Sequence, residues 1–174
     1  MSDQSKVRKW VEQIVPKYMQ DYKIPGLSVA VVKEGETIYS AGFGSRDPQK
    51  NLPATPDTLY GIGSITKSFV AIAIMQLVEE GLLDVDDPVS KYIPFKIGLP
   101  GKPIKIHHFL THSSGLPSLA TSSVALHRGI GIDKGIPWGS VGDFYRLVNA
   151  AQDEIAAEPG VRFFYHNAAW RMLG

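Results

Sequence analysis

The chain has 174 residues, of which 44% are hydrophobic and 20% are charged, and its formal net charge is +1. This is the composition of one globular domain rather than of a disordered or fibrous chain, and so balanced a charge gives no reason to expect a nucleic-acid partner. The sequence has no cysteine, which excludes disulfides, thiolate metal ligands and a cysteine nucleophile.

The N-terminal third predicts a helix followed by a β-hairpin. The first ten residues are polar and unlike a secretory signal, and the longest apolar stretch is too short to span a membrane, so we expect a cytoplasmic protein. Apolar residues recur at helical spacing over residues 7–18, which indicates an amphipathic helix. Residues 27–33 and 37–44 are rich in apolar and β-branched side chains on either side of a Glu-Gly-Glu turn, as in paired strands. The polar stretch 45–58, with three prolines, is predicted to be a loop.

The middle of the chain predicts a long central helix. Residues 65–81 are apolar on nearly every side, which is typical of a helix buried in the centre of a domain, and Gly81 is suited to its C-terminus. A turn with a short helix (84–94) and a connector rich in proline and glycine (94–103) follow. The next segment, 104–117, begins as a strand or helix and ends in a Ser-Gly turn.

The C-terminal part predicts loops and helices on an incomplete sheet. Residues 118–139 are mixed and glycine-rich, as in a long loop. Ser140 and Asp143 have the spacing of a helix N-cap, and we expect this helix to run to about Ala157. The order of elements predicts an α+β fold, with helices packed on an antiparallel sheet. Because an isolated hairpin is marginal in water, the sheet needs strands that this chain does not contain.

A serine followed three residues later by a lysine, in GIGSITKSF, is the first candidate for catalysis. Side chains at i and i+3 share one face of a helix, so Ser64 and Lys67 can touch. A serine hydroxyl needs a neighbouring base, and burial among apolar side chains would disfavour the lysine ammonium, so that a neutral Lys67 could accept the Ser64 proton. The helix N-terminus would favour a developing anion. The alternative is structural, with Ser64 as an ordinary N-cap and Lys67 extending to water.

Tyr165 and Asn167, in EPGVRFFYHN, are the second candidates. A phenol near a lysine ammonium can serve as a base or proton shuttle. The amide of an asparagine can both donate to and accept from a substrate amide. The alternatives are a core aromatic with a satisfied hydroxyl and an asparagine that belongs to a turn.

Three histidines, His107, His108 and His112, lie in the segment HHFLTHSSGLP. His108 and His112 are four residues apart, as in a helical zinc pair, but no carboxylate lies within the segment. A structural corner between a helix and a loop is therefore favoured over a metal site.

Taken in this order, the segments resemble the serine β-lactamase and penicillin-binding-protein superfamily. The resemblance is greatest to its class C-like branch of class C β-lactamases, D-aminopeptidases, D,D-carboxypeptidases and esterases. Residues 60–94 are similar to the nucleophile helix and the segment after it, 104–117 to a His-Thr-Ser-Gly-Leu corner, 158–167 to a Tyr-x-Asn segment and 24–44 to an opening hairpin. The resemblance extends from about residue 10 to the end of the chain.

The resemblance implies a β-lactamase/transpeptidase-like fold and a serine hydrolase that works through a serine acyl-enzyme. Ser64 would be the acylated nucleophile, Lys67 its proton partner, Tyr165 the base or shuttle and Asn167 a ligand of the substrate amide. The oxyanion hole would combine the Ser64 backbone N–H with one from a sheet strand. The substrate would be an amide or ester in a small molecule or peptide, and no metal or organic cofactor is implied.

The chain departs from the family pattern in two places. His166 stands where serine or alanine is usual, and it would either add a titrating group beside Tyr165 or point away. The third motif of the family, Lys-Thr-Gly or His-x-Gly, and the rest of its sheet lie far downstream, whereas this chain ends at Gly174. We therefore expect residues 1–174 to be the N-terminal portion of a single catalytic domain, with the C-terminal remainder as its partner.

Three functions compete. The leading one is a serine hydrolase for an amide or ester, above all a peptidase that prefers D-residues or an esterase. The second is a binding module, either a penicillin-recognising sensor that is acylated and then stalls or a relative that no longer reacts. The third is a structural domain, in which Ser64→Ala would change only the stability, by about 1 kcal/mol. The substrate stays open, as does the oligomeric state, a homo-oligomer included.

Overall fold

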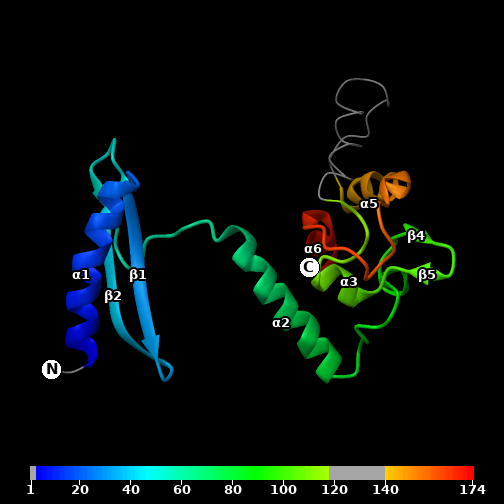
Figure 1. The fold of residues 1–174 in the computed structure, drawn as a ribbon, viewed down its shortest axis with the longest axis horizontal. Helices are drawn as coiled ribbons and strands as arrows, with labels where there is room; N and C mark the ends of the chain where they lie inside the picture. The colour runs from blue at the N-terminus through cyan, green and yellow to red at the C-terminus, as the bar shows by residue number, and fades with distance from the viewer. Residues whose placement is uncertain (1–2, 118–139) are drawn as a thin grey trace. The chain divides into compact units, whose positions relative to one another are not determined.

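The computed structural model describes residues 3–117 and 140–174, which form two compact units, Met1–Gly61 and Ile62–Gly174 (Figure 1). The predicted loop at 118–139 lies outside the described residues. No helix among the described residues combines the length and the apolar character needed to cross a membrane.

The N-terminal unit is a helix beside a small antiparallel sheet. Its elements are α1 (Asp3–Asp21), β1 (Gly26–Lys33), β2 (Glu36–Asp47) and β3 (Leu52–Pro53), with the strands in the order β1-β2-β3 (Figure 1). The predicted hairpin is confirmed, and its pairing runs from Gly26 opposite Gly44 to Lys33 opposite Glu36. In α1 the buried residue is Val11.

The predicted loop at 45–58 is wrong at its start. β2 continues to Asp47, and β3 returns so that Ser45 lies opposite Pro53. The hydroxyl of Ser45 donates to the carbonyl of Leu52 at 2.7 Å, and the Ala54 N–H donates to the carbonyl of Gly44 at 2.9 Å. The side chain of Ser45 here binds the backbone of the neighbouring strand, so a polar residue does not prevent pairing.

The C-terminal unit is mainly helical. Its helices and turns are η1 (Gly63–Ile65), α2 (Thr66–Glu79), η2 (Val89–Lys91), α3 (Ile106–Leu110), α5 (Val141–Asn149), η3 (Gln152–Glu154) and α6 (Asn167–Leu173), and β4 (Gly98–Leu99) pairs with β5 (Lys102–Pro103). The core of the unit contains Phe109, Leu116 and Val148, which are fully buried. The sequence segments that carry the four candidate site residues all lie in this unit.

The helix predicted over 65–81 exists as α2, preceded by the 3₁₀ turn η1. It ends at Glu79 with Glu80 as the C-cap, and Gly81, in the position expected of it directly after the cap, has a φ of +71°. The Gly81 N–H donates to Val78 O at 3.0 Å and the Leu82 N–H to Leu77 O at 2.9 Å, which is the Schellman pattern.

The expectation that this helix is buried on every side is wrong for the described residues. Ile74 is its buried residue, whereas Phe69 is 63% and Ile72 60% exposed. The apolar residues of α2 are suited to burial, but no described element of the same unit covers the side of the helix that carries Phe69 and Ile72.

The helix after Ser140 is shorter than predicted. The Ser140 hydroxyl accepts the Asp143 N–H at 3.2 Å, so the predicted N-cap is confirmed. The helix ends at Asn149 rather than near Ala157, and the Asn149 side chain donates to Pro94 O at 2.9 Å and accepts the Lys96 N–H at 2.8 Å. A tertiary contact therefore holds the end of α5, which periodicity does not reveal.

Candidate active site

Ser64 lies in the 3₁₀ turn η1, directly before α2. The N-cap positions of η1 and α2 are Ile62 and Ile65, and neither makes a side-chain capping hydrogen bond. Ser64 therefore occupies no N-cap position, and the capping alternative for this serine is wrong. Its side chain is exposed and takes part in side-chain contacts instead.

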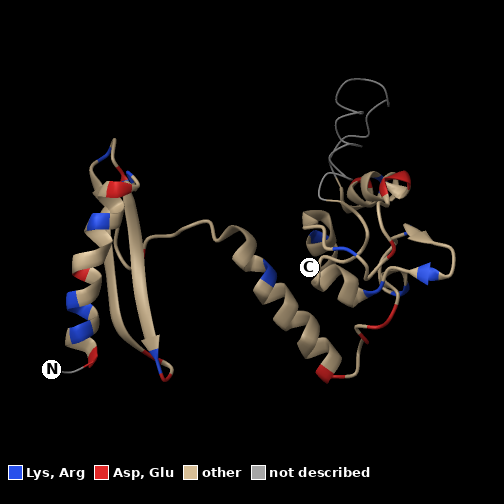
Figure 2. Ribbon diagram, in the orientation of Figure 1, with Lys and Arg blue, Asp and Glu red and all other residues tan. Residues whose placement is uncertain are grey.

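Lys67 is the basic residue of α2, whose other charged residue, Glu79, lies at the far end of the helix (Figure 2). Its ammonium donates to Ser64 Oγ at 3.2 Å and to Asn167 Oδ1 at 2.9 Å. The contact predicted from the i,i+3 spacing is thus present. Lys67 is half-buried rather than buried, because α2 is largely exposed, and its ammonium is held by two oxygen acceptors.

Tyr165 reaches Ser64 from the extended segment before α6. Its phenol donates to Ser64 Oγ at 2.5 Å, and the Lys67 ammonium lies 4.8 Å from the centroid of its ring. The hydrogen bond from Lys67, followed by that with Ser64, lowers the pKa of the phenol below its ordinary value. The side chain is 37% exposed, so Tyr165 is not a buried core aromatic.

Asn167 is the first residue of α6, and its side chain is exposed. Its Oδ1 atom accepts from Lys67, which links α6 to the start of α2. The structure therefore brings all four candidates together: Ser64, Lys67, Tyr165 and Asn167 are joined by three side-chain hydrogen bonds.

The three histidines of the 104–117 segment bind three different partners. The Nδ1 atom of His107 lies 3.2 Å from Val85 O, and Nδ1 of His108 accepts the Lys105 N–H at 3.0 Å. The ring of His112 packs near α6. Among the described residues no three histidine, aspartate or glutamate side chains are grouped as a metal site would require. The segment forms a structural corner between α3 and the following turn.

His166 is fully buried, beside Tyr165 in the chain. Neither of its ring nitrogens has a hydrogen-bond partner within the described parts of the chain. Burial, together with the nearby ring of His112, lowers the pKa of His166 to about 4. The imidazole is therefore neutral near pH 7, and it adds no charge beside Tyr165 there.

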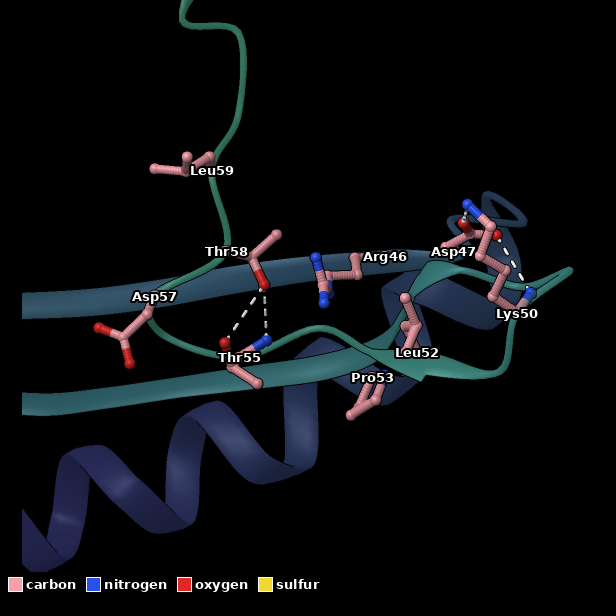
Figure 3. A pocket seen from close by; sticks show the side chains of 9 residues that line it. All are labelled: Arg46, Asp47, Lys50, Leu52, Pro53, Thr55, Asp57, Thr58 and Leu59. Atoms are coloured by element: carbon pink, nitrogen blue, oxygen red, sulfur yellow. Dashed lines mark hydrogen bonds and ion pairs between the residues drawn. The ribbon is translucent and has the colours of Figure 1, made fainter.

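A separate surface pocket lies in the N-terminal unit, at the end of β2 and β3 and beside residues 55–59 (Figure 3). Its polar groups bind one another: Lys50 Nζ lies 3.3 Å from Asp47 Oδ2, and the Thr55 N–H donates to Thr58 Oγ1 at 2.8 Å. None of the four candidate residues lines this pocket, and we assign it no role in catalysis.

Comparison with known proteins identifies the family. The model of the family described as Beta-lactamase matches residues 11–174, and the chain therefore belongs to this family. It is 35% identical over 167 residues to Protein flp of Staphylococcus aureus (strain N315), a match that covers 94% of this chain and 32% of that protein. It is 40% identical over 103 residues to the teichoic acid D-alanine hydrolase of Staphylococcus aureus (strain MRSA252), covering 59% of this chain and 25% of the hydrolase.

Solved structures show the same relationship. The octameric penicillin-binding protein homologue from Pyrococcus abyssi is similar with a TM-score of 0.80 and 42% identity, over 99% of this chain and 38% of that chain. A class C β-lactamase is similar with a TM-score of 0.75 and 26% identity, over 99% and 44% of the two chains. The predicted superfamily and the β-lactamase/transpeptidase-like fold are confirmed. The chain spans about a third of the length of the curated relatives that it matches first.

Proposed function

We propose that Ser64 is the nucleophile of a serine hydrolase that cleaves an amide or ester through an acyl-enzyme. The observation that carries the proposal is the convergence of two proton-bearing groups on one hydroxyl. Ser64 Oγ lies 2.5 Å from the Tyr165 phenol and 3.2 Å from the Lys67 ammonium. Membership of the Beta-lactamase family and the hydrolases named among the relatives support it.

Tyr165 is the general base of the proposed reaction. The positive charge of Lys67 favours the phenolate, which reverses the hydrogen bond so that Ser64 Oγ–H donates to Tyr165. As Oγ forms its bond to the substrate carbonyl carbon, its proton passes to Tyr165. The phenol then gives this proton to the leaving nitrogen or oxygen as the scissile bond breaks, and a serine ester remains.

Water completes the cycle by the same route. The Tyr165 phenolate takes a proton from the attacking water, and the Ser64 ester oxygen recovers a proton as the acid product leaves. Lys67 remains a cation that stabilises the phenolate and positions Asn167. The Asn167 amide binds the substrate amide, and the Ser64 backbone N–H supplies one donor to the oxyanion. The second donor is expected from a strand of the C-terminal remainder of the domain.

The substrate class proposed is an ester or amide of a D-residue. This proposal draws on the names of the relatives, one of which is a teichoic acid D-alanine hydrolase and another a penicillin-binding protein homologue. The alternative is a sensor that is acylated by a β-lactam and then stalls. Because the homologue from Pyrococcus abyssi is octameric, we also propose that the protein forms a homo-oligomer.

The test is intact-mass spectrometry after exposure to a fluorophosphonate probe. The protein is expressed from its natural gene, so that any chain accompanying residues 1–174 is present. We expect one adduct in the wild-type protein and in the control Ser68→Ala, which alters the next serine of α2, and none in Ser64→Ala. A wild-type protein without an adduct at Ser64 would contradict the proposal. Slow loss of a β-lactam adduct without turnover of D-residue esters would identify the sensor instead.

A further inference from the structure

His112 occupies the position just beyond the end of α3 that a glycine usually takes. Its φ is 57°, in the left-handed region. The His112 N–H donates to Phe109 O at 3.2 Å and the Ser113 N–H to His108 O at 2.8 Å, which is a Schellman motif. α2 ends with the same pair of hydrogen bonds, but there the residue is Gly81.

The comparison with Gly81 shows that the backbone alone does not require a histidine. A β-carbon is strained in the left-handed conformation, whereas glycine adopts it freely. A strained backbone conformation of this kind persists where surrounding contacts hold the residue in place, and such residues are frequent at functional sites. The side chain of His112 must therefore make contacts that compensate for the conformation.

The ring of His112 makes these contacts with the segment that carries Tyr165. The residue is 8% exposed, and its ring stacks on that of Tyr165 with centroids 4.3 Å apart and planes inclined by 28°. Nδ1 faces the His166 N–H at 3.0 Å, and Nε2 faces the indole N–H of Trp170 at 3.0 Å. The His112 carbonyl accepts the Phe164 N–H at 2.8 Å.

We propose that His112 is a positioning residue that holds the Tyr165 phenol against Ser64. This inference rests on the proposed function, in which Tyr165 is the base. His112 binds the backbone N–H on both sides of Tyr165, through its carbonyl to Phe164 and its ring to His166, and the stacked ring sets the plane of the phenol. In this position the Tyr165 phenol donates a hydrogen bond to Ser64 Oγ at 2.5 Å.

The arrangement requires a neutral His112. A neutral imidazole offers one acceptor nitrogen to the two facing N–H groups, whereas an imidazolium offers none. Burial, and next the charge of Lys67, lower the pKa of His112, which favours the neutral ring. Within the described parts of the chain, the charged and titratable groups that these contacts place around the ring are Lys67, Tyr165 and His166.

Two substitutions of His112 distinguish a role in positioning Tyr165 from a role in ending helix α3. His112→Gly suits the left-handed backbone but removes the ring, and His112→Asn tolerates the same backbone while keeping one side-chain acceptor. Lys23, another left-handed residue with a φ of 53°, provides the matched control Lys23→Gly. The natural-length protein is used throughout, and circular dichroism checks that each variant folds.

The first measurement is the rate of fluorophosphonate labelling of Ser64. We expect it to fall at least tenfold in His112→Gly, to fall less in His112→Asn and to stay unchanged in Lys23→Gly. If His112→Gly does not fold, His112→Asn decides the question. Wild-type labelling rates in the folded histidine variants would overturn the proposal.

The second measurement does not depend on activity. Tyrosine labelled with ¹³C at Cζ reports the titration of Tyr165 by NMR, with the signal assigned from Tyr165→Phe. In His112→Asn we expect Tyr165 to titrate at higher pH than in the wild-type protein, because its hydroxyl is no longer held within reach of Lys67 and Ser64. If the fluorophosphonate does not label Ser64 in the wild-type protein, only the proposed function is contradicted. If the Tyr165 titration is the same in His112→Asn as in the wild-type protein, the positioning role of His112 is contradicted.

Discussion

Tyr165 donates its phenolic hydrogen to Ser64 Oγ over 2.5 Å, although 101 residues separate them in the chain. Lys67 donates to the same oxygen from within the first turn of α2. The hydroxyl is therefore held between a group that can take its proton and a cation that favours the deprotonated form of that group.

Tyr165→Phe removes the proposed base while it keeps the aromatic ring. We expect the rate of acylation to fall by a factor of about 10²–10⁴, the usual size of general acid–base catalysis, with little change in substrate binding. Single-turnover kinetics with an activated ester measure the two separately. Tyr92→Phe is the matched control, because Tyr92 also loses a 2.5 Å hydrogen bond, to Asp87, outside the site. Equal rates in Tyr165→Phe and the wild-type protein would contradict the assignment.

Lys67→Met removes the cation that contacts Ser64 and Asn167. We expect acylation to fall about as much as in Tyr165→Phe, and the double variant to fall little further, because residues that act as one unit are not additive. The control is Lys91→Met, which breaks an ion pair of 2.6 Å with Asp87. Additive losses in the double variant would show that the two residues act independently.

The pH profile of acylation should follow Tyr165. Its hydrogen bonds with Lys67 and Ser64 lower the pKa of the phenol, so the phenolate fraction at a given pH exceeds that of an ordinary tyrosine. The rate should therefore rise with pH and level off before the ordinary tyrosine value of 10.0. In Lys67→Met the same rise should move to higher pH. Stopped-flow acylation between pH 6 and 10 measures the shift, and a profile that is unchanged in the variant speaks against a phenolate base.

His166 should make the protein sensitive to acid. An unfolded histidine titrates near 6.5, whereas burial lowers the pKa of folded His166 to about 4. Between these values the unfolded state binds more protons, so the free energy of unfolding decreases as pH falls from 6.5 towards 4. A shift of this size corresponds to about 3 kcal/mol.

His166→Leu removes this dependence at a fully buried position. Urea denaturation at pH 7, 5.5 and 4.5 should show a smaller loss of stability in the variant than in the wild-type protein. The free energy of unfolding of the variant should still decrease somewhat as pH falls, because burial also lowers the pKa of His108 to about 4. Identical slopes in the two proteins would show that His166 is not protected from protonation in the folded state.

Residues 1–174 by themselves are predicted neither to fold stably nor to turn over substrate. The large exposed side chains of α2, among them Phe69 and Ile72, leave apolar surface in water that a stable domain would bury. A purified chain of verified mass should bind a hydrophobic dye and unfold without a cooperative transition. Cooperative unfolding together with robust turnover would refute this prediction.

Local patterns predicted several of the elements correctly. The hairpin of β1 and β2 follows from two β-branched segments around a turn. Gly81 lies just after the end of α2, where the hydrogen bonds of the last helical turn favour a left-handed residue. The contact of Lys67 with Ser64 also follows from sequence, because three residues correspond to one turn. Such features depend on neighbours within a few residues, which the sequence displays directly.

Other features depended on tertiary contacts. Asn149 ends α5 through hydrogen bonds to residues 94–96, and the exposure of α2 depends on what packs against it. The sequence predicted a structural corner at His112, but no pattern showed that its ring lies on Tyr165. A histidine where a helix end favours glycine is the one signal that could have indicated it.

By itself the sequence determined the residue types, the turn-length spacing of Ser64 and Lys67 and the resemblance to the family. Only the tertiary structure decided that Tyr165 meets Ser64, that Asn167 meets Lys67 and that the ring of His112 lies on Tyr165, because the path of the intervening chain sets these positions. Periodicity describes which face of an element is apolar. Of the two contacts that make the Ser64 hydroxyl a candidate nucleophile, the one with Lys67 is local, and the one with Tyr165 comes from a segment that is distant in the chain and adjacent in space.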